Sequence, residues 1–239
     1  MIHDILENKK AINGISVLVE EDISDVERLL LDDDGKLIPV HASELSEVSQ
    51  NKLRIFCLTH GIYSVPTFEL IDEIRSLVPN LEKSIQIGAG NGVYGRALGI
   101  KMTDNFMQSP KNSKKFKGVI ESYLLAGQPL VKYGSDVLEI DGNEAVKRFK
   151  PETVFMSWVT HKWKPENHHL GGNMFGVDME ALLNRKHIKR IILVGNKQVH
   201  ESSPLMNHPH EEIELPNFIF SRATDKTLDR LYVWNLNHD

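Results

Sequence analysis

The feature that most constrains the fold of this chain is a glycine-rich turn directly after a short strand-like run. Ser84–Ile87 leads into Gly88-Ala89-Gly90-Asn91-Gly92, and a helix is expected over 93–98. Glycine suits such a turn because the backbone bends sharply there and a ligand can approach without meeting a Cβ atom. The free N–H groups at the start of the helix then face that ligand. The pattern predicts a strand, a turn and a helix that together bind a nucleotide.

The rest of the chain beyond Leu81 alternates between strand-like and helix-like segments, which predicts a parallel sheet covered by helices on both faces. The last two strand-like runs are separated by a length that suits an antiparallel hairpin. The sequence therefore predicts a doubly wound α/β fold that ends in a β-hairpin. We expect strands at 84–87, 101–103, 137–140, 153–158, 190–194, 217–221 and 231–236, and helices near 93–98, 114–125, 143–149 and 177–185.

The first 61 residues have a different character, and we expect them to form an N-terminal α+β extension to a domain spanning 62–239. The Asp34-Gly35 pair lies between apolar runs and predicts a β-hairpin turn. A helix is expected from Ser43 to His60, where Gly61 ends it, and Thr67 is positioned to cap the next helix.

Composition excludes several classes of protein. No apolar run approaches the roughly 20 residues that span a bilayer. The net charge of −5 argues against a large nucleic-acid interface, although Lys111, Lys114, Lys115 and Lys117 form a local basic run. The single cysteine, Cys57, lies among apolar residues and is expected to be a buried small hydrophobe. These features favour a cytoplasmic protein without a membrane segment, and they leave the oligomeric state open.

Two acids follow successive strands after the glycine turn. Asp104 and Asn105 end the second expected strand, where a carboxylate can accept hydrogen bonds from both ribose hydroxyls. Asp141 and Gly142 follow the third strand, where the acid is placed to accept from an adenine amino group. Asp141 is equally well placed to cap the next helix, and both interpretations stay open.

These residues resemble the class I S-adenosylmethionine-dependent methyltransferases over roughly 62–236. Ile85–Gly92 is similar to the first motif of that family, Asp104 to its ribose-binding acid, and Asp141 to the acid that commonly contacts adenine. The resemblance implies a Rossmann-like, mostly parallel seven-stranded sheet with an antiparallel last strand. It also implies S-adenosylmethionine as the cofactor.

A narrower resemblance is visible to a poorly characterised methyltransferase-like group. Its features correspond here to Tyr63-Ser64-Val65-Pro66-Thr67, Ser157-Trp158, Val194-Gly195 and Leu231-Tyr232-Val233-Trp234. The segment before the first strand packs over the cofactor in this fold, which places Tyr63 near the methionine end of the ligand. The cofactor-binding residues implied are Tyr63, Gln86, Gly88, Ala89, Gly90, Gly92, Asp104, Asn105, Asp141, Gly142, Ser157 and Trp158.

The chain departs from the family pattern in ways that separate cofactor binding from catalysis. The first motif usually carries an acid two residues before its first glycine, where this chain has Gln86. The Asn-Pro-Pro-Tyr signature of amino-group methylation on bases is replaced by Ser157–His161. Pro204 and Pro209 interrupt the region where a helix is expected between the fifth and sixth strands.

Methyl transfer requires no obligatory catalytic residue, because the driving force resides in the cofactor. His161 and His200 follow the fourth and fifth strands and are the candidates for a general base. Trp158 and Trp163 are candidates for the wall of the acceptor pocket. The pairs His168-His169 and His208-Pro209-His210 lack the helical spacing or cysteine partners of a zinc site, so no metal is expected.

Three functions remain compatible with the sequence. The first is an S-adenosylmethionine-dependent methyltransferase that acts on a small molecule or a protein. The second is a non-catalytic module of the same fold, which binds the cofactor or a partner. The third is an NAD(P)-binding oxidoreductase, because Gly90–Gly95 formally fits G-x-G-x-x-G.

Overall fold

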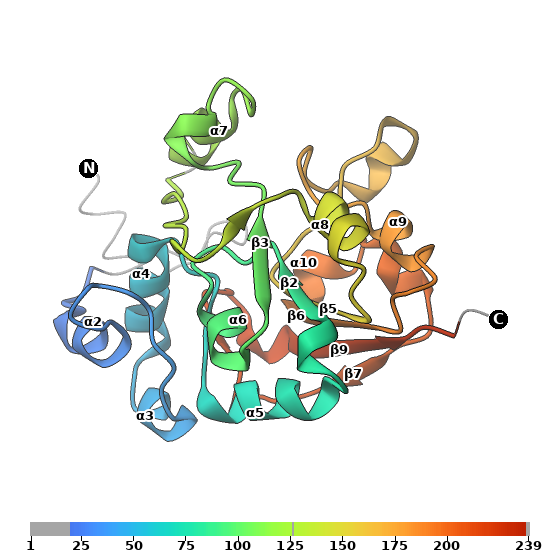
Figure 1. The fold of residues 1–239 in the computed structure, drawn as a ribbon. Helices are drawn as coiled ribbons and strands as arrows, with labels where there is room; N and C mark the ends of the chain where they lie inside the picture. The colour runs from blue at the N-terminus through green and yellow to red at the C-terminus, as the bar shows by residue number, and fades with distance from the viewer. Residues whose placement is uncertain (1–19, 126, 238–239) are drawn as a thin grey trace.

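A computed structural model describes residues 20–125 and 127–237 of the chain (Figure 1). A mostly parallel sheet forms the centre, and helices lie on both of its faces. The helices of the described part are α2 (Ser24–Leu30), α3 (Ala42–Ser46), α4 (Gln50–His60), α5 (Phe68–Leu77), α6 (Val93–Leu98), α7 (Val119–Leu125), α8 (Gly142–Phe149), α9 (Met179–Leu183) and α10 (Lys197–His200).

The central sheet has seven strands in the order β4-β3-β2-β5-β6-β9-β7. Neighbouring strands are parallel from β4 to β6, and β9 runs antiparallel to both β6 and β7. The strands β3 and β4 follow β2 on one side of the sheet, whereas β5 and β6 lie on the other side of β2. The strand order therefore reverses between β2 and β5. These strands are β2 (Ser84–Ile87), β3 (Lys101–Asp104), β4 (Leu138–Glu139), β5 (Thr153–Ser157), β6 (Arg190–Asn196), β7 (Glu211–Ile213) and β9 (Asp229–Asn235).

Successive residues of the central strands belong to different cores. Phe155 and Ile192 pack with residues of α2 to α6 on one face of the sheet. Val154 and Ile191, one position earlier in each strand, pack with α8 and α9 on the other face. This alternation follows from the period of two along a strand, and all four side chains have an exposed fraction of 0%. The sheet is therefore covered on both faces, as the sequence predicted.

The N-terminal part of the described chain packs on the first of these faces. Gly61 ends α4 in the left-handed conformation, and the Thr67 hydroxyl accepts a hydrogen bond from the N–H of Leu70 at the start of α5, as expected. Asp34-Gly35 does form a turn, but it follows helix α2 and is closed by a single bridge between Leu31 and Leu37. The prediction of a hairpin of two strands here was wrong, because 29–30 complete an amphipathic helix. The boundary between 61 and 62 stays a prediction.

The C-terminal hairpin also differs from the prediction in one strand. The run 217–221 was expected to pair with the last strand, but β9 pairs with β7 (Glu211–Ile213) instead. Phe220–Ser221 forms β8, which pairs with β1 (Ser64–Val65) in a separate two-stranded ribbon. The sheet thus keeps its expected antiparallel ending with a different penultimate strand. No helix within 20–125 or 127–237 is long and apolar enough to cross a membrane.

Candidate functional site

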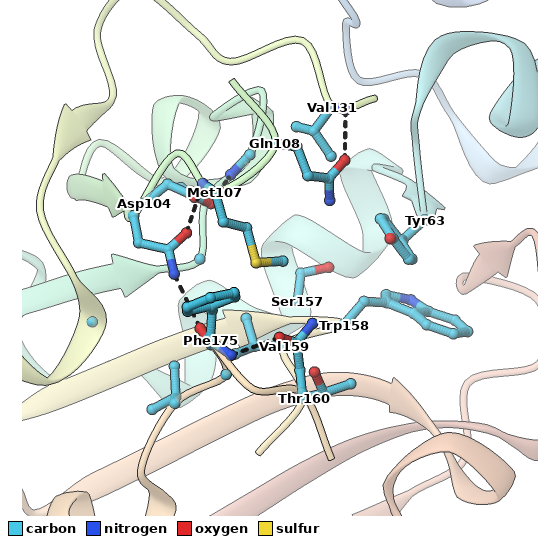
Figure 2. Close-up of a pocket in the computed structure, with 18 of the residues that line it drawn as sticks. Tyr63, Asp104, Met107, Gln108, Val131, Ser157, Trp158, Val159, Thr160 and Phe175 are labelled. Atoms are coloured by element: carbon cyan, nitrogen blue, oxygen red, sulfur yellow. Dashed lines mark hydrogen bonds between the residues drawn. The ribbon is translucent and has the colours of Figure 1, made fainter. Parts of the chain in front are cut away.

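A cavity of about 410 Å³ opens at the carboxyl ends of the parallel strands, beside the point where the strand order reverses. Ligands of open α/β sheets bind at this position, and the volume lies in the range of small-molecule sites. Figure 2 shows Asp104 on one side of the cavity and Tyr63 with Trp158 on the other. Met107 and Phe175 lie between these two sides.

The glycine turn forms the floor of this cavity. Gly88 and Gly90 have φ of +61° and +56°, in the left-handed region that side chains rarely adopt. A Cβ atom on Gly88 would lie 2.5 Å from Cγ2 of Val159, so both the conformation and the available space require glycine there. Gly92 has φ of +81° and starts helix α6, but it does not line the cavity.

Asp104 ties the glycine turn to the tip of β3. Its Oδ2 accepts a hydrogen bond from the N–H of Gly90 at 3.0 Å, and its Oδ1 accepts one from the N–H of Phe106 at 3.0 Å. Each carboxylate oxygen has two acceptor positions, so one on each oxygen remains for a ligand. Burial raises the pKa of Asp104, and the backbone N–H donors oppose that effect.

Asp141 has the capping role that the sequence left open, and its role toward an adenine ring stays a prediction. Its carboxylate accepts hydrogen bonds from the N–H groups of Asn143 and Glu144, so it caps helix α8. Asp141 and Gly142 also line the cavity on the side of Asp104. The neighbouring Asn105 donates from Nδ2 to the carbonyl oxygen of Phe175 at 3.0 Å, which fastens the loop carrying Phe175 to the end of β3.

The opposite side of the cavity is aromatic. The rings of Tyr63 and Trp158 lie 6.1 Å apart between centroids, and the Trp158 ring is 6.0 Å from that of His200. Trp158 has φ of +58°, which is strained for a residue with a side chain. Its indole Nε1 is buried and has no hydrogen-bond partner among the described residues. A strained backbone and an unpaired buried donor therefore coincide at Trp158.

A chain of hydroxyl groups lies beneath this aromatic side. Ser64 Oγ is 3.1 Å from the Tyr94 hydroxyl and 3.2 Å from Ser157 Oγ. The Tyr94 hydroxyl donates to the carbonyl oxygen of Val65 at 3.3 Å. Because the Tyr94 hydroxyl proton is used in this bond, the Ser64 hydroxyl donates to Tyr94, and the Ser157 hydroxyl donates to Ser64. Ser157 then keeps its acceptor positions for a ligand.

Gln86 lies deep in the same region, where the family pattern has an acid. The side chain is 2% exposed and lines the cavity. Its Oε1 has no hydrogen-bond partner among the described residues. The nearby Gly95 leaves room for it, since a Cβ atom there would lie 2.7 Å from this oxygen.

The two histidines expected as candidate bases occupy different places. His161 lines the cavity, whereas His200 is not among the lining residues and lies against Trp158. Burial lowers the pKa of both imidazoles, while nearby backbone carbonyl groups oppose the effect. His200 Nδ1 lies 3.1 Å from the backbone nitrogen and 3.0 Å from the carbonyl oxygen of Asn196, so it accepts from the first in one tautomer and donates to the second in the other.

The low pKa of His200 predicts how the variant His200→Asn changes the pH dependence of stability. Because the folded pKa lies below the unfolded value near 6.5, the unfolded state takes up protons first as the pH falls through that value. We expect the free energy of unfolding of the wild type to fall between pH 7 and pH 5 because of His200, and that of the variant to fall less over this range. Urea unfolding at both pH values measures the difference, and equal losses would contradict it.

Eleven of the twelve cofactor-binding residues expected from the sequence line the cavity, and Gly92 is the exception. Trp163, expected as a possible wall of the acceptor pocket, does not line it either. His168 and His169 are exposed, and no group of three or more potential metal ligands occurs among residues 20–125 and 127–237. Several lining residues were not expected from the sequence: Tyr123 of α7, and Met107, Gln108, Val131, Tyr133 and Phe175 of loops.

The missed residues belong mainly to the long connection between β3 and β4. The four lysines of the basic run in this connection, Lys111, Lys114, Lys115 and Lys117, are exposed. The useful signal was the length of this connection after a strand tip, together with its two tyrosines, Tyr123 and Tyr133. Tyr133 stacks on Phe106 with centroids 4.1 Å apart, which holds the connection against the end of β3.

Comparison with known proteins gives similar structures but no similar sequences. No protein-family model and no curated protein matches the chain. An uncharacterised protein from Listeria monocytogenes serotype 4b is 12% identical with a TM-score of 0.37, covering 72% of this chain and 68% of that one. The 23S rRNA methyltransferase ErmE is 12% identical with a TM-score of 0.37, covering 71% and 68%.

A third similar structure is the SAM-dependent methyltransferase from Agrobacterium tumefaciens. It is 12% identical with a TM-score of 0.34, covering 71% of this chain and 60% of that one. At this level of similarity, inferences about function depend on the strand order and the cavity of the chain itself.

Proposed function

We propose that the protein binds S-adenosylmethionine in this cavity and transfers its methyl group to an acceptor. The observation that carries the proposal is Asp104, which holds the glycine turn and keeps one free acceptor position on each oxygen. A ribose with two vicinal hydroxyls suits that pair of positions. On the adjacent side, Asp141 and Gly142 are available to an adenine ring, and Gly88 and Gly90 allow the close approach of a ligand.

The bound cofactor would supply a methyl group on a sulfonium, and the residues of the chain orient the reactants. Ser157 presents an oxygen acceptor at the cavity, where it would receive an N–H donor from the amino-acid end of the ligand, and Gln86 lines the same cavity with its Oε1 packed against Gly95. The left-handed turn at Trp158 directs the following residues across the glycine turn, because Val159 contacts the space above Gly88. The chain's contribution is to align the reacting groups and exclude water.

Isothermal titration with S-adenosylhomocysteine tests the proposal. We expect binding of one molecule per chain, and a rise of roughly 5–10 °C in Tm at ligand concentrations near 100 Kd. NADH at the same concentration serves as the control for an oxidoreductase and should give no heat. Absence of heat with both S-adenosylmethionine and S-adenosylhomocysteine would exclude the proposal.

A second candidate function is a module of this fold that binds the cofactor without turnover. It is favoured by Gln86, whose unpaired Oε1 stands where the family has an acid. Mass spectrometry of candidate acceptors after incubation with S-adenosylmethionine distinguishes the two functions. A gain of one methyl group that requires the protein would rule out the second.

A further inference from the structure

A chain of three hydroxyl groups begins at Tyr94, a residue that the proposed function leaves without a role. Tyr94 lies on α6, directly after the glycine turn, and its side chain is buried. Burial raises the pKa of its hydroxyl, which therefore keeps its single proton at neutral pH. That proton goes to the carbonyl oxygen of Val65 at 3.3 Å. At its other contact, 3.1 Å from Ser64 Oγ, the Tyr94 hydroxyl therefore accepts.

This direction of donation extends through two serines to the cavity. Ser64 uses its proton on Tyr94, so it accepts from Ser157 Oγ at 3.2 Å. Ser157 uses its own proton on Ser64 and keeps only acceptor positions. Ser64 is 5% exposed, whereas Ser157 is partly exposed and lines the cavity, so Ser157 is the member of the chain that is most open to a ligand.

A hydroxyl that only accepts distinguishes between the two charged groups of an amino acid. An ammonium group offers three donors and no acceptor, whereas a carboxylate offers acceptors only. The ammonium forms a charge-assisted hydrogen bond with Ser157, and the carboxylate would place two acceptors against each other. Removing the hydroxyl of Tyr94 would free the Ser64 proton to turn toward Ser157, and Ser157 would then donate into the cavity.

We propose that Tyr94 is a positioning residue that makes the Ser157 hydroxyl an acceptor, so that Ser157 selects the ammonium group of the cofactor. Tyr94 acts through Ser64 and does not touch the reacting atoms. This assignment rests on the proposed function, because it takes the amino-acid end of the cofactor to lie at Ser157. It adds an orientation to that function: the ammonium group faces Ser157, and the carboxylate points away from it.

Isothermal titration of the full chain with three ligands tests the assignment. The ligands are S-adenosylhomocysteine, its analogue with hydrogen in place of the amino group, and 5′-methylthioadenosine, which lacks the amino-acid end. The variant Tyr94→Phe keeps the buried ring and removes the hydroxyl. We expect it to bind S-adenosylhomocysteine about fivefold more weakly than the wild type does, because the hydrogen bond to the ammonium group loses its fixed acceptor. Its affinity for the two ligands without an amino group should change by less than about twofold.

A double-mutant cycle tests whether Tyr94 acts through Ser157. Ser157→Ala removes the acceptor itself and should weaken the binding of S-adenosylhomocysteine at least about tenfold, and adding Tyr94→Phe should cause no further loss. Ser64→Ala breaks the chain in its middle, so it should reproduce the selective loss of Tyr94→Phe and replaces that variant where it does not fold. The matched control is Tyr232→Phe, which should bind all three ligands as the wild type does. Tyr232 is 1% exposed, does not line the cavity, and has a hydroxyl without a hydrogen-bond partner among the described residues.

Thermal unfolding without ligand shows which variants are folded. Equal weakening of all three ligands, or losses that add in the double variant, would show that Tyr94 only supports the shape of the cavity and would overturn the assignment. Unchanged binding of S-adenosylhomocysteine to a folded Tyr94→Phe protein would overturn it as well. In each of these cases the wild type still binds S-adenosylhomocysteine, so the proposed function stands. Failure of S-adenosylhomocysteine to bind to the wild type would overturn the proposed function, and the assignment with it.

Discussion

Replacing Asp104 by asparagine is expected to weaken the binding of S-adenosylhomocysteine roughly 100-fold, which is close to 2.7 kcal/mol. The carboxylate accepts from the N–H groups of Gly90 and Phe106 and has one free acceptor position on each oxygen. An amide nitrogen in place of one oxygen would face a backbone N–H and could not accept from a ribose hydroxyl. Hydrogen bonds to charged groups contribute about 1.5–3 kcal/mol each, so these losses account for the expected change.

The variant Asp72→Asn is the matched control, because it makes the same chemical change on the exposed face of α5. Asp72 has a side chain that is 72% exposed and pairs with Arg75. Titration of both variants separates an effect on the ligand from a general effect of lost charge. Thermal unfolding without ligand then shows whether Asp104→Asn remains folded. A folded Asp104→Asn protein that binds as the wild type does would exclude Asp104 as the ribose-binding acid.

The strands and turns with strong local signals were predictable from the sequence. Ser84–Ile87 alternates polar residues with isoleucine and is followed by glycine, and both its bounds and the helix Val93–Leu98 agree with the structure. Caps such as Thr67 and Gly61 were predictable because their contacts lie within one helical turn. The site residues on strand tips followed from the same signals, since the carboxyl ends of parallel strands meet at one edge.

Features that depend on tertiary contacts could not be predicted in this way. Glu211–Ile213 is short, polar and exposed, so only its pairing with β9 makes it a strand. The more apolar 217–221 has a stronger strand pattern, yet it pairs in part with Ser64–Val65 beside the cavity. Tyr133 reaches the cavity only because its ring stacks on Phe106, a contact between distant residues.

The departure at Gln86 leads to a second large expected effect, in the variant Gln86→Glu. The side chain at this position is 2% exposed, its Oε1 has no partner, and Met102 also borders the space over Gly95. A carboxylate here would be buried without a donor or a cation. We expect the variant to lose roughly 2–4 kcal/mol of unfolding free energy at pH 7.5.

The pH dependence of this loss distinguishes an unpaired charge from a packing defect. Burial raises the folded pKa of a glutamate above its unfolded value near 4.3, so the penalty is present at high pH and shrinks as the pH falls through the folded pKa. Urea unfolding at pH 7.5 and 5.5 should therefore show a smaller deficit at the lower pH. Gln198→Glu, on the exposed face of α10, should change stability by less than about 0.5 kcal/mol at either pH.

Adding S-adenosylhomocysteine extends the same experiment to the ligand. If its ammonium group lies near residue 86, as the proposed orientation requires, it supplies the missing counter-charge. Saturation with the ligand should then stabilise Gln86→Glu more than it stabilises the wild type at pH 7.5. Equal stabilisation of both proteins would place the ammonium elsewhere. A Gln86→Glu protein as stable as the wild type without ligand would show that this chain can accept the family's acid, so that glutamine here would not mark a loss of turnover.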